Sequence, residues 1–164
     1  MHAGLTGHLM FSTIHAESVA GVFTRLLNMN VEPFVLASAV SGVLGQRLVR
    51  KLCTHCREEV EPSAHELEQL ARLGVTLKDD DGPFFRSTGC PRCFEMGVQG
   101  RTGIFELMVV DDVLQEELVK EVRTHQIYEM AREQGMVGLM ECGMRKAREG
   151  TISLEELLTV MTVS

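Results

Sequence analysis

The sequence predicts a mostly helical α/β protein with a small cysteine-rich module inserted into it. An apolar run at residues 9–11 and a mostly apolar run at residues 104–110, which includes one glutamate, are typical of buried β-strands. Over most of the remaining chain, apolar residues recur every three or four positions, which is the spacing of amphipathic helices. Two Cys-x-x-Cys pairs, separated by 33 residues, interrupt this pattern and indicate a metal-binding module.

Length and charge exclude some classes of protein. The 164 residues suffice for one average domain or two small ones, and a hydrophobic fraction of 45% is normal for a globular chain. No apolar run approaches the ~20 residues of a membrane span. The net charge is −7, yet residues 47–101 hold nine basic and nine acidic side chains. A zinc ribbon that binds nucleic acid normally has a basic surplus near its metal, so we expect no nucleic-acid partner.

The first third of the chain predicts one strand and two helices. Residues 9–11 read as a strand covered on both faces, and polar residues including His15 follow at its carboxyl end, where open α/β sheets bind ligands. Residues 18–28 predict an amphipathic helix. A second helix is expected to begin at a proline and to cover residues 33–51. The two glycines inside it would each weaken it by roughly 1 kcal/mol relative to alanine.

The two cysteine pairs, Cys53/Cys56 and Cys90/Cys93, carry the strongest chemical signal. Four thiolates supplied in pairs predict a closed tetrahedral zinc site without an open position for a catalytic water. A redox dithiol is the main alternative, although such a pair would open a helix and glycines flank the second pair here. Disulfides are typical of secreted chains, and no signal-peptide pattern opens this one. His55, inside the first pair, is expected to be a surface residue.

Between the cysteine pairs, Ser63 and Glu66 form a capping box that predicts a helix ending at Gly74. Residues 79–81 are three consecutive aspartates. Adjacent carboxylates do not match the alternating ligands of a calcium loop, so we interpret them as a solvated turn.

After the second pair, residues 103–110 predict a strand, and the pattern is helical from there to the end of the sequence. Asp111 or Asp112, Thr124 and Ser153 are the expected N-caps, and Ser153 is expected to form a second capping box with Glu156. Cys142 lies on an apolar helix face and is expected to be buried. The predicted helices cover residues 113–122, 126–134, 139–149 and 154–160.

Taken together, these motifs resemble the C-terminal part of the type II secretion and type IV pilus assembly ATPases, of the general secretory pathway protein E and pilus assembly protein B type. Residues 5–15 are similar to their histidine box, and residues 24–34 to the stretch after it. Residues 45–53 lead into a tetracysteine zinc module, residues 100–107 are similar to its return strand, and residues 150–156 to the closing helix. The resemblance covers essentially the whole sequence, in order.

The resemblance implies a division into three parts. Residues 1–52 would be the C-terminal part of a RecA-like P-loop ATPase core, with the histidine box and two helices. Residues 53–93 would be the zinc-binding module, and residues 94–164 the return strand with a helical C-terminal subdomain.

The resemblance also implies roles for individual residues. His15 and His8 would approach the nucleotide γ-phosphate. Arg25, Arg47 and Arg50 are candidates for contacts with the nucleotide or a neighbouring subunit. The alternative is that the histidines only end a buried strand and that the arginines form surface salt bridges.

The family hydrolyses ATP and assembles into homohexamers. Its partners are an inner-membrane platform protein and cytoplasmic recruitment proteins, so the resemblance implies a cytoplasmic protein held peripherally at the inner membrane. This sequence has no Gly-Lys dipeptide, and therefore no P-loop, and it lacks the Walker B segment. We expect a fragment of a longer motor that binds about one zinc and hydrolyses no ATP alone, with ATP and Mg²⁺ bound only by the full-length parent. The alternatives are a self-standing zinc-binding interaction module and a thiol redox protein.

Overall fold

The structure is a computed structural model, and it describes residues 2–78, 82–120 and 123–162. It divides into two compact units. Unit 1 combines Met1–Gly45 with Phe105–Gly138, and unit 2 combines Gln46–Ile104 with Leu139–Ser164. Two long strands, β1 (Gly42–Leu52) and β4 (Val98–Val109), pair with each other, and each contributes residues to both units.

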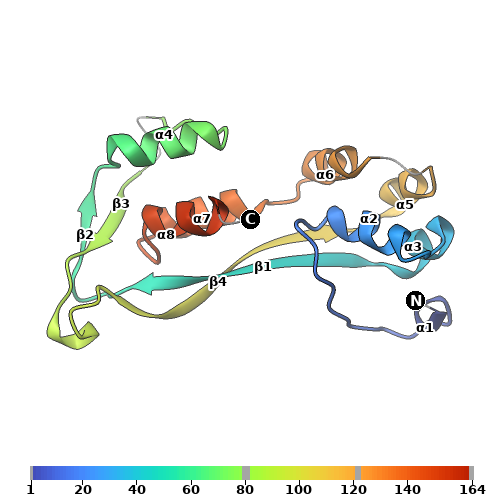
Figure 1. The fold of residues 1–164 in the computed structure, drawn as a ribbon, viewed down its shortest axis with the longest axis horizontal. Coiled ribbons are helices and arrows are strands. Elements are labelled where there is room, and N and C mark those ends of the chain that lie inside the picture. Colours follow the sequence, from blue (N-terminus) through green and yellow to red (C-terminus); the bar gives the residue numbers. More distant parts are fainter. Residues whose placement is uncertain (1, 79–81, 121–122, 163–164) are drawn as a thin grey trace. The chain divides into compact units, whose positions relative to one another are not determined.

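Unit 1 is mostly helical (Figure 1). Helix α3 packs against α1, α2 and α5, and α6 packs against α2 and α5. The core joins Phe23 of α2 to Met108 of β4 and Leu114 of α5, all of which are fully buried. The helices of this unit are α1 (His2–Leu5), α2 (Gly21–Asn28), α3 (Pro33–Ala39), α5 (Asp112–Val119) and α6 (Thr124–Glu133).

Unit 2 combines a pair of short antiparallel strands with several helices. Strands β2 (Arg57–Val60) and β3 (Phe84–Ser87) pair antiparallel, with Arg57 opposite Ser87. Figure 1 shows these two strands side by side below α4. Helix α8 packs against α4, α7 and β3, around a core that includes Leu70, Ile104 and Leu157. The helices of this unit are α4 (Ala64–Arg72), the 3-10 turn η1 (Pro91–Cys93), α7 (Leu139–Arg148) and α8 (Leu154–Thr162).

Most of the predicted helices are confirmed, and so are several of their caps. The capping box of α4 is complete, because the Ser63 backbone N–H donates to Glu66 Oε2 at 2.8 Å and the Glu66 N–H donates to Ser63 Oγ at 3.3 Å. Asp111 caps α5 by accepting a hydrogen bond from the Leu114 N–H at 2.9 Å. The N-cap of α6 is Arg123 and not a threonine, so that prediction was one residue late.

The predicted strand at residues 9–11 is wrong. The chain has no regular secondary structure from His8 to Ala16, and the side chains of Leu9, Met10 and Phe11 are 77%, 63% and 88% exposed. A buried strand needs neighbours that pair with its backbone groups. Within the described residues the sheets are β1–β4 and β2–β3, and neither includes this segment.

The predicted helix over residues 33–51 is only partly right. It begins at Pro33 as expected, but α3 ends at Ala39 and the chain continues as β1. Backbone pairing with β4 makes residues 42–52 a strand, although their apolar residues have the spacing of a helix. A glycine at position 45 suits this arrangement, because a Cβ there would lie 2.9 Å from Glu106 Cγ.

Two features predicted from the sequence fall outside the described residues. These are the aspartates at 79–81 and the last two residues of the predicted helix at 113–122. Among the helices that the structure describes, none is long and apolar enough to cross a membrane.

Candidate metal centre and surrounding residues

Both cysteine pairs lie at turns of unit 2. Cys53 follows the last residue of β1, and Cys56 precedes the first residue of β2. The backbone N–H groups of Cys56 and Arg57 donate to the Cys53 carbonyl oxygen at 3.4 and 3.1 Å and close this turn. Cys90 and Cys93 stand at the two ends of η1, where the Cys93 N–H donates to the Cys90 carbonyl oxygen at 3.0 Å. Two tight turns thus present two sulfur atoms each.

The four sulfur atoms form a cluster with the dimensions of a single metal site. All four lie within 4.8 Å of one another. The Sγ atoms of Cys53 and Cys90 are 3.9 Å apart, those of Cys56 and Cys93 are 3.9 Å apart, and those of Cys90 and Cys93 are 3.7 Å apart. Tetrahedral zinc with Zn–S bonds of about 2.3 Å separates its sulfur ligands by about 3.8 Å. The residues present therefore fit a zinc ion, and the thiols are not joined as disulfides.

Burial and backbone hydrogen bonds change the pKa values of two of these thiols, Cys56 and Cys93. Burial opposes ionisation of Cys93, but the N–H groups of Cys90 and Gly97, each 3.2 Å from its sulfur, outweigh burial and lower its pKa to about 7. Burial raises the pKa of Cys56 to about 12. A cation at the centre of the cluster would favour the thiolate form of all four ligands. Metal binding would therefore release protons and weaken in acid.

The second turn adopts an unusual backbone. Gly89 has φ 92°, and a Cβ there would lie 2.7 Å from the Glu95 carbonyl oxygen. Phe94 and Glu95 also have positive φ angles of 54° and 61°, which cost about 1–2 kcal/mol each for residues other than glycine. The Glu95 and Met96 N–H groups donate to the carbonyl oxygens of Cys90 and Cys93 at 3.0 and 3.1 Å, so the turn is held by the metal-site residues themselves.

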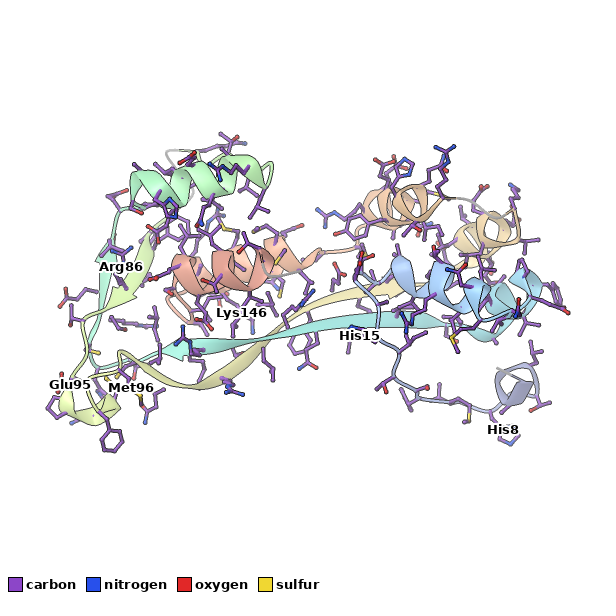
Figure 2. All side chains as sticks on the ribbon, viewed as in Figure 1. His8, His15, Arg86, Glu95, Met96 and Lys146 are labelled. Atoms are coloured by element: carbon purple, nitrogen blue, oxygen red, sulfur yellow. The ribbon has the colours of Figure 1, made fainter. Side chains whose placement is uncertain are left out.

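The two histidines of the predicted histidine box lie in the segment that precedes α2, and Figure 2 labels both of them. His8 and His15 are exposed to solvent. The His8 ring lies 3.0 Å from Thr6 Oγ1.

The other predicted site residues belong to both units, Arg25 to unit 1 and Arg47 and His55 to unit 2. Arg25 is exposed near the end of α2, and Arg47 is half-buried in β1. His55 lies in the first cysteine turn and is exposed, as predicted, and its two ring nitrogens are 3.1 and 3.0 Å from Arg92 Nη1. The metal candidates of the described residues include the four cysteines and no histidine.

Glu106 is a buried charged residue that the interpretation of the sequence missed. Its side chain is 4% exposed in unit 1, where its carboxylate accepts hydrogen bonds from the Val19 N–H at 3.4 Å and the Tyr128 hydroxyl at 3.5 Å. The alternation of side chains along a strand could have predicted this burial, because Glu106 shares a face with the apolar residues Ile104 and Met108. This carboxylate links β4 to the segment just before α2 and to α6.

Comparisons with known proteins agree with the resemblance. The family model described as "Type II/IV secretion system protein" matches residues 1–159. The type IV pilus assembly ATPase PilB of Thermus thermophilus is 44% identical over 157 residues, which are 95% of this chain and 17% of that protein. The type II secretion system ATPase E of Vibrio cholerae is 41% identical over 160 residues, 98% of this chain and 31% of that protein. The type II secretion system protein HxcR of Pseudomonas aeruginosa is 44% identical over 161 residues, 98% of this chain and 30% of that protein. The chain thus spans less than a third of the length of each.

Proposed function

Because the chain belongs to the type II/IV secretion system protein family, we propose that it is the zinc-containing C-terminal region of a motor ATPase that drives protein secretion or pilus assembly. The named relatives are ATPases of both systems. In this proposal residues 1–52 belong to a RecA-like core, residues 53–93 form the zinc module, and residues 94–164 return the chain to a helical C-terminal subdomain.

The clustering of the four cysteines carries the metal part of the proposal. Cys53, Cys56, Cys90 and Cys93 would hold one zinc ion in a closed site of four thiolates. Such a site leaves no position for a substrate or a reactive water, so the zinc would be structural and would hold the two cysteine turns together. Metal binding of this kind contributes directly to folding free energy.

The nucleotide part of the proposal concerns the longer protein. There, His15 and His8 would lie near the γ-phosphate of ATP bound with Mg²⁺, and Arg25 and Arg47 would contact the nucleotide or a neighbouring subunit of a hexameric ring. The exposure of both histidines leaves their rings accessible to such a ligand. Phosphoryl transfer needs a phosphate cradle, and the 164 residues contain no G-x-x-x-x-G-K-[ST] motif, so this chain alone would hydrolyse no ATP.

The proposed partners come from the resemblance to the secretion and pilus assembly ATPases. The parent motor would act on an inner-membrane platform protein and would be held at the membrane from the cytoplasmic side by recruitment proteins. No nucleic acid is required by any feature of the sequence.

Metal analysis of the purified chain tests the proposal most simply. We expect one zinc per chain, with four thiols masked from a thiol reagent until a chelator is added, and no ATPase activity. Four reactive thiols without metal would contradict the zinc site and favour a redox dithiol protein. ATP turnover that co-purifies with the chain through successive columns would contradict the assignment of the nucleotide cradle to the longer protein.

A second candidate is a self-standing zinc-binding module for protein interaction. It is favoured by one observation, which is that all four metal ligands lie within unit 2 and need no part of an ATPase core. The genomic sequence upstream of residue 1 distinguishes the two candidates. A reading frame that continues into a P-loop supports the motor, and a stop codon directly upstream supports the module.

A further inference from the structure

The turn between α7 and α8 contacts both sides of the first cysteine pair. The N–H of Leu52, immediately before the first cysteine, donates to the Thr151 carbonyl oxygen at 2.9 Å. The guanidinium of Arg57, immediately after the second cysteine, donates from Nη1 to the carbonyl oxygens of Gly150 at 2.6 Å and Glu149 at 3.4 Å. Residues more than 90 positions away in sequence therefore hold the backbone on either side of two metal ligands.

Arg57 is fixed by a second contact. Its guanidinium carbon lies 5.5 Å from the centre of the Phe85 ring, in cation–π geometry. Gly150 completes the arrangement, because it has φ 67° and a Cβ there would lie 2.9 Å from Phe85 Cδ2 and 3.0 Å from Arg57 Nη1. The α7–α8 turn can approach Arg57 this closely only because position 150 has no side chain.

The first cysteine pair is thus held from two directions. The Cys53 N–H donates to the Gly97 carbonyl oxygen at 2.9 Å, which ties it to the second cysteine turn. Leu52 and Arg57 tie it to the α7–α8 turn. Residues that orient metal ligands without touching the metal commonly change metal affinity by 10–100-fold.

We propose that the α7–α8 turn supports the metal site as a third structural element, beside the two cysteine turns. Arg57 and Gly150 are positioning residues that set metal affinity. Bound metal in turn orders α7 and α8. This inference rests on the zinc site proposed above. The coupling must be reciprocal, because two equilibria that share contacts change each other by the same factor. Weakening the turn should weaken metal binding, and removing metal should loosen the turn.

Gly150→Ala tests the coupling, and Gly74→Ala is its matched control. Both glycines belong to unit 2 and have positive φ angles of 67° and 75°, so both alanines bear the same local backbone strain. A Cβ at Gly74 meets nothing within 4 Å, whereas one at Gly150 meets Arg57 and Phe85. In competition with a chromophoric zinc chelator, we expect Gly150→Ala to weaken zinc affinity about 10-fold and Gly74→Ala to leave it within about 2-fold.

Arg57→Gln provides an independent test, with Lys51→Gln as its control. Arg57 follows Cys56 and Lys51 lies two residues before Cys53, so both variants remove one positive charge next to the first cysteine pair. A purely electrostatic effect would therefore appear in both variants. We expect only Arg57→Gln to weaken zinc binding about 10-fold. Arg57→Lys, which keeps a donor for the Gly150 carbonyl, should restore part of the loss.

Amide hydrogen exchange of the full chain supplies a readout other than affinity. Chelation of zinc should accelerate exchange across residues 149–153 and α8 in the wild-type chain, and Gly150→Ala should do the same in the presence of zinc. Equal zinc affinities for Gly150→Ala and Gly74→Ala, or unchanged exchange in α8 after chelation, would overturn the coupling while leaving the zinc site intact. A wild-type chain that binds no zinc would overturn the site and the coupling together.

Discussion

Replacing Glu156 by glutamine should destabilise unit 2 in a way that depends on pH. Glu156 of α8 is 11% exposed and accepts hydrogen bonds from Arg50 Nε, Nη2 and backbone N at 2.8, 2.6 and 2.8 Å. A glutamine keeps an oxygen for the backbone N–H but loses the charge-assisted pair. Such bonds contribute about 1.5–3 kcal/mol when buried and about 0–1 kcal/mol when exposed. Since the Arg50 side chain is 61% exposed, we expect a loss of about 1 kcal/mol at pH 7.

The pH dependence has a definite sign. Burial would raise the pKa of Glu156, but hydrogen bonds from the Arg50 side chain and backbone, together with its charge, hold the pKa below its ordinary value of 4.5. A group whose pKa is lowered on folding contributes stability above its unfolded pKa and loses that contribution as pH falls through its folded pKa. The difference between wild type and Glu156→Gln should therefore be full at pH 7 and shrink below about pH 4.5.

Urea unfolding followed by circular dichroism measures this difference. Wild type and variants are compared at each pH in the same metal state, because zinc is expected to leave the cysteines in acid. Glu155→Gln is the control, because Glu155 is an exposed carboxylate on the same turn of α8 and a change there should stay within about 0.5 kcal/mol. Two results would refute a stabilising Arg50–Glu156 pair. One is that Glu156→Gln loses no more stability than Glu155→Gln at pH 7. The other is that the loss of Glu156→Gln is the same at pH 4 and pH 7.

Three further predictions concern the cysteine cluster and the packing around Gly45 in unit 1. Cys93→Ser should abolish zinc binding at micromolar metal in a chelator competition, whereas Cys142→Ser should retain one zinc per chain because Cys142 lies outside the cluster. Gly45→Ala should destabilise unit 1 by about 1–3 kcal/mol in thermal unfolding, because the new Cβ would lie 2.9 Å from Glu106 Cγ. Gly7→Ala is the control, because a Cβ there meets nothing within 4 Å. Its loss of stability should not exceed the roughly 1–2 kcal/mol that a positive φ angle costs a residue other than glycine. Lowering the pH from 7 to 5 should release zinc to a competing dye, because protons compete with the metal for the thiolates; release that is independent of pH would contradict thiolate ligation.

The elements whose signals are local could be predicted from the sequence. Ser63 and Glu66 cap α4, and Asp111 caps α5, because each cap depends on residues three positions apart. The cysteine spacing likewise predicts that the four sulfur atoms meet, and the structure brings them within 4.8 Å of one another. At Ser153 only half of the expected box forms, since its hydroxyl accepts the Glu156 N–H at 3.1 Å while the Glu156 carboxylate binds Arg50.

The features decided by distant partners could not be predicted. Residues 42–52 continue the helical spacing of apolar residues, but pairing with β4 makes them a strand. The apolar run at residues 9–11 reads as a strand, yet the described residues provide no neighbour for it. The contact of Arg57 with the α7–α8 turn is a third such feature, because nothing near Arg57 in sequence indicates that the Gly150 carbonyl will accept its hydrogen bond.

X-ray absorption spectroscopy at the zinc edge tests the central claim most directly. The account predicts a single shell of four sulfur atoms at about 2.3 Å in the full chain, lost on treatment with a chelator. A shell containing nitrogen or oxygen ligands at about 2.0–2.2 Å, which would leave a thiol out of the site, would contradict the closed four-cysteine site.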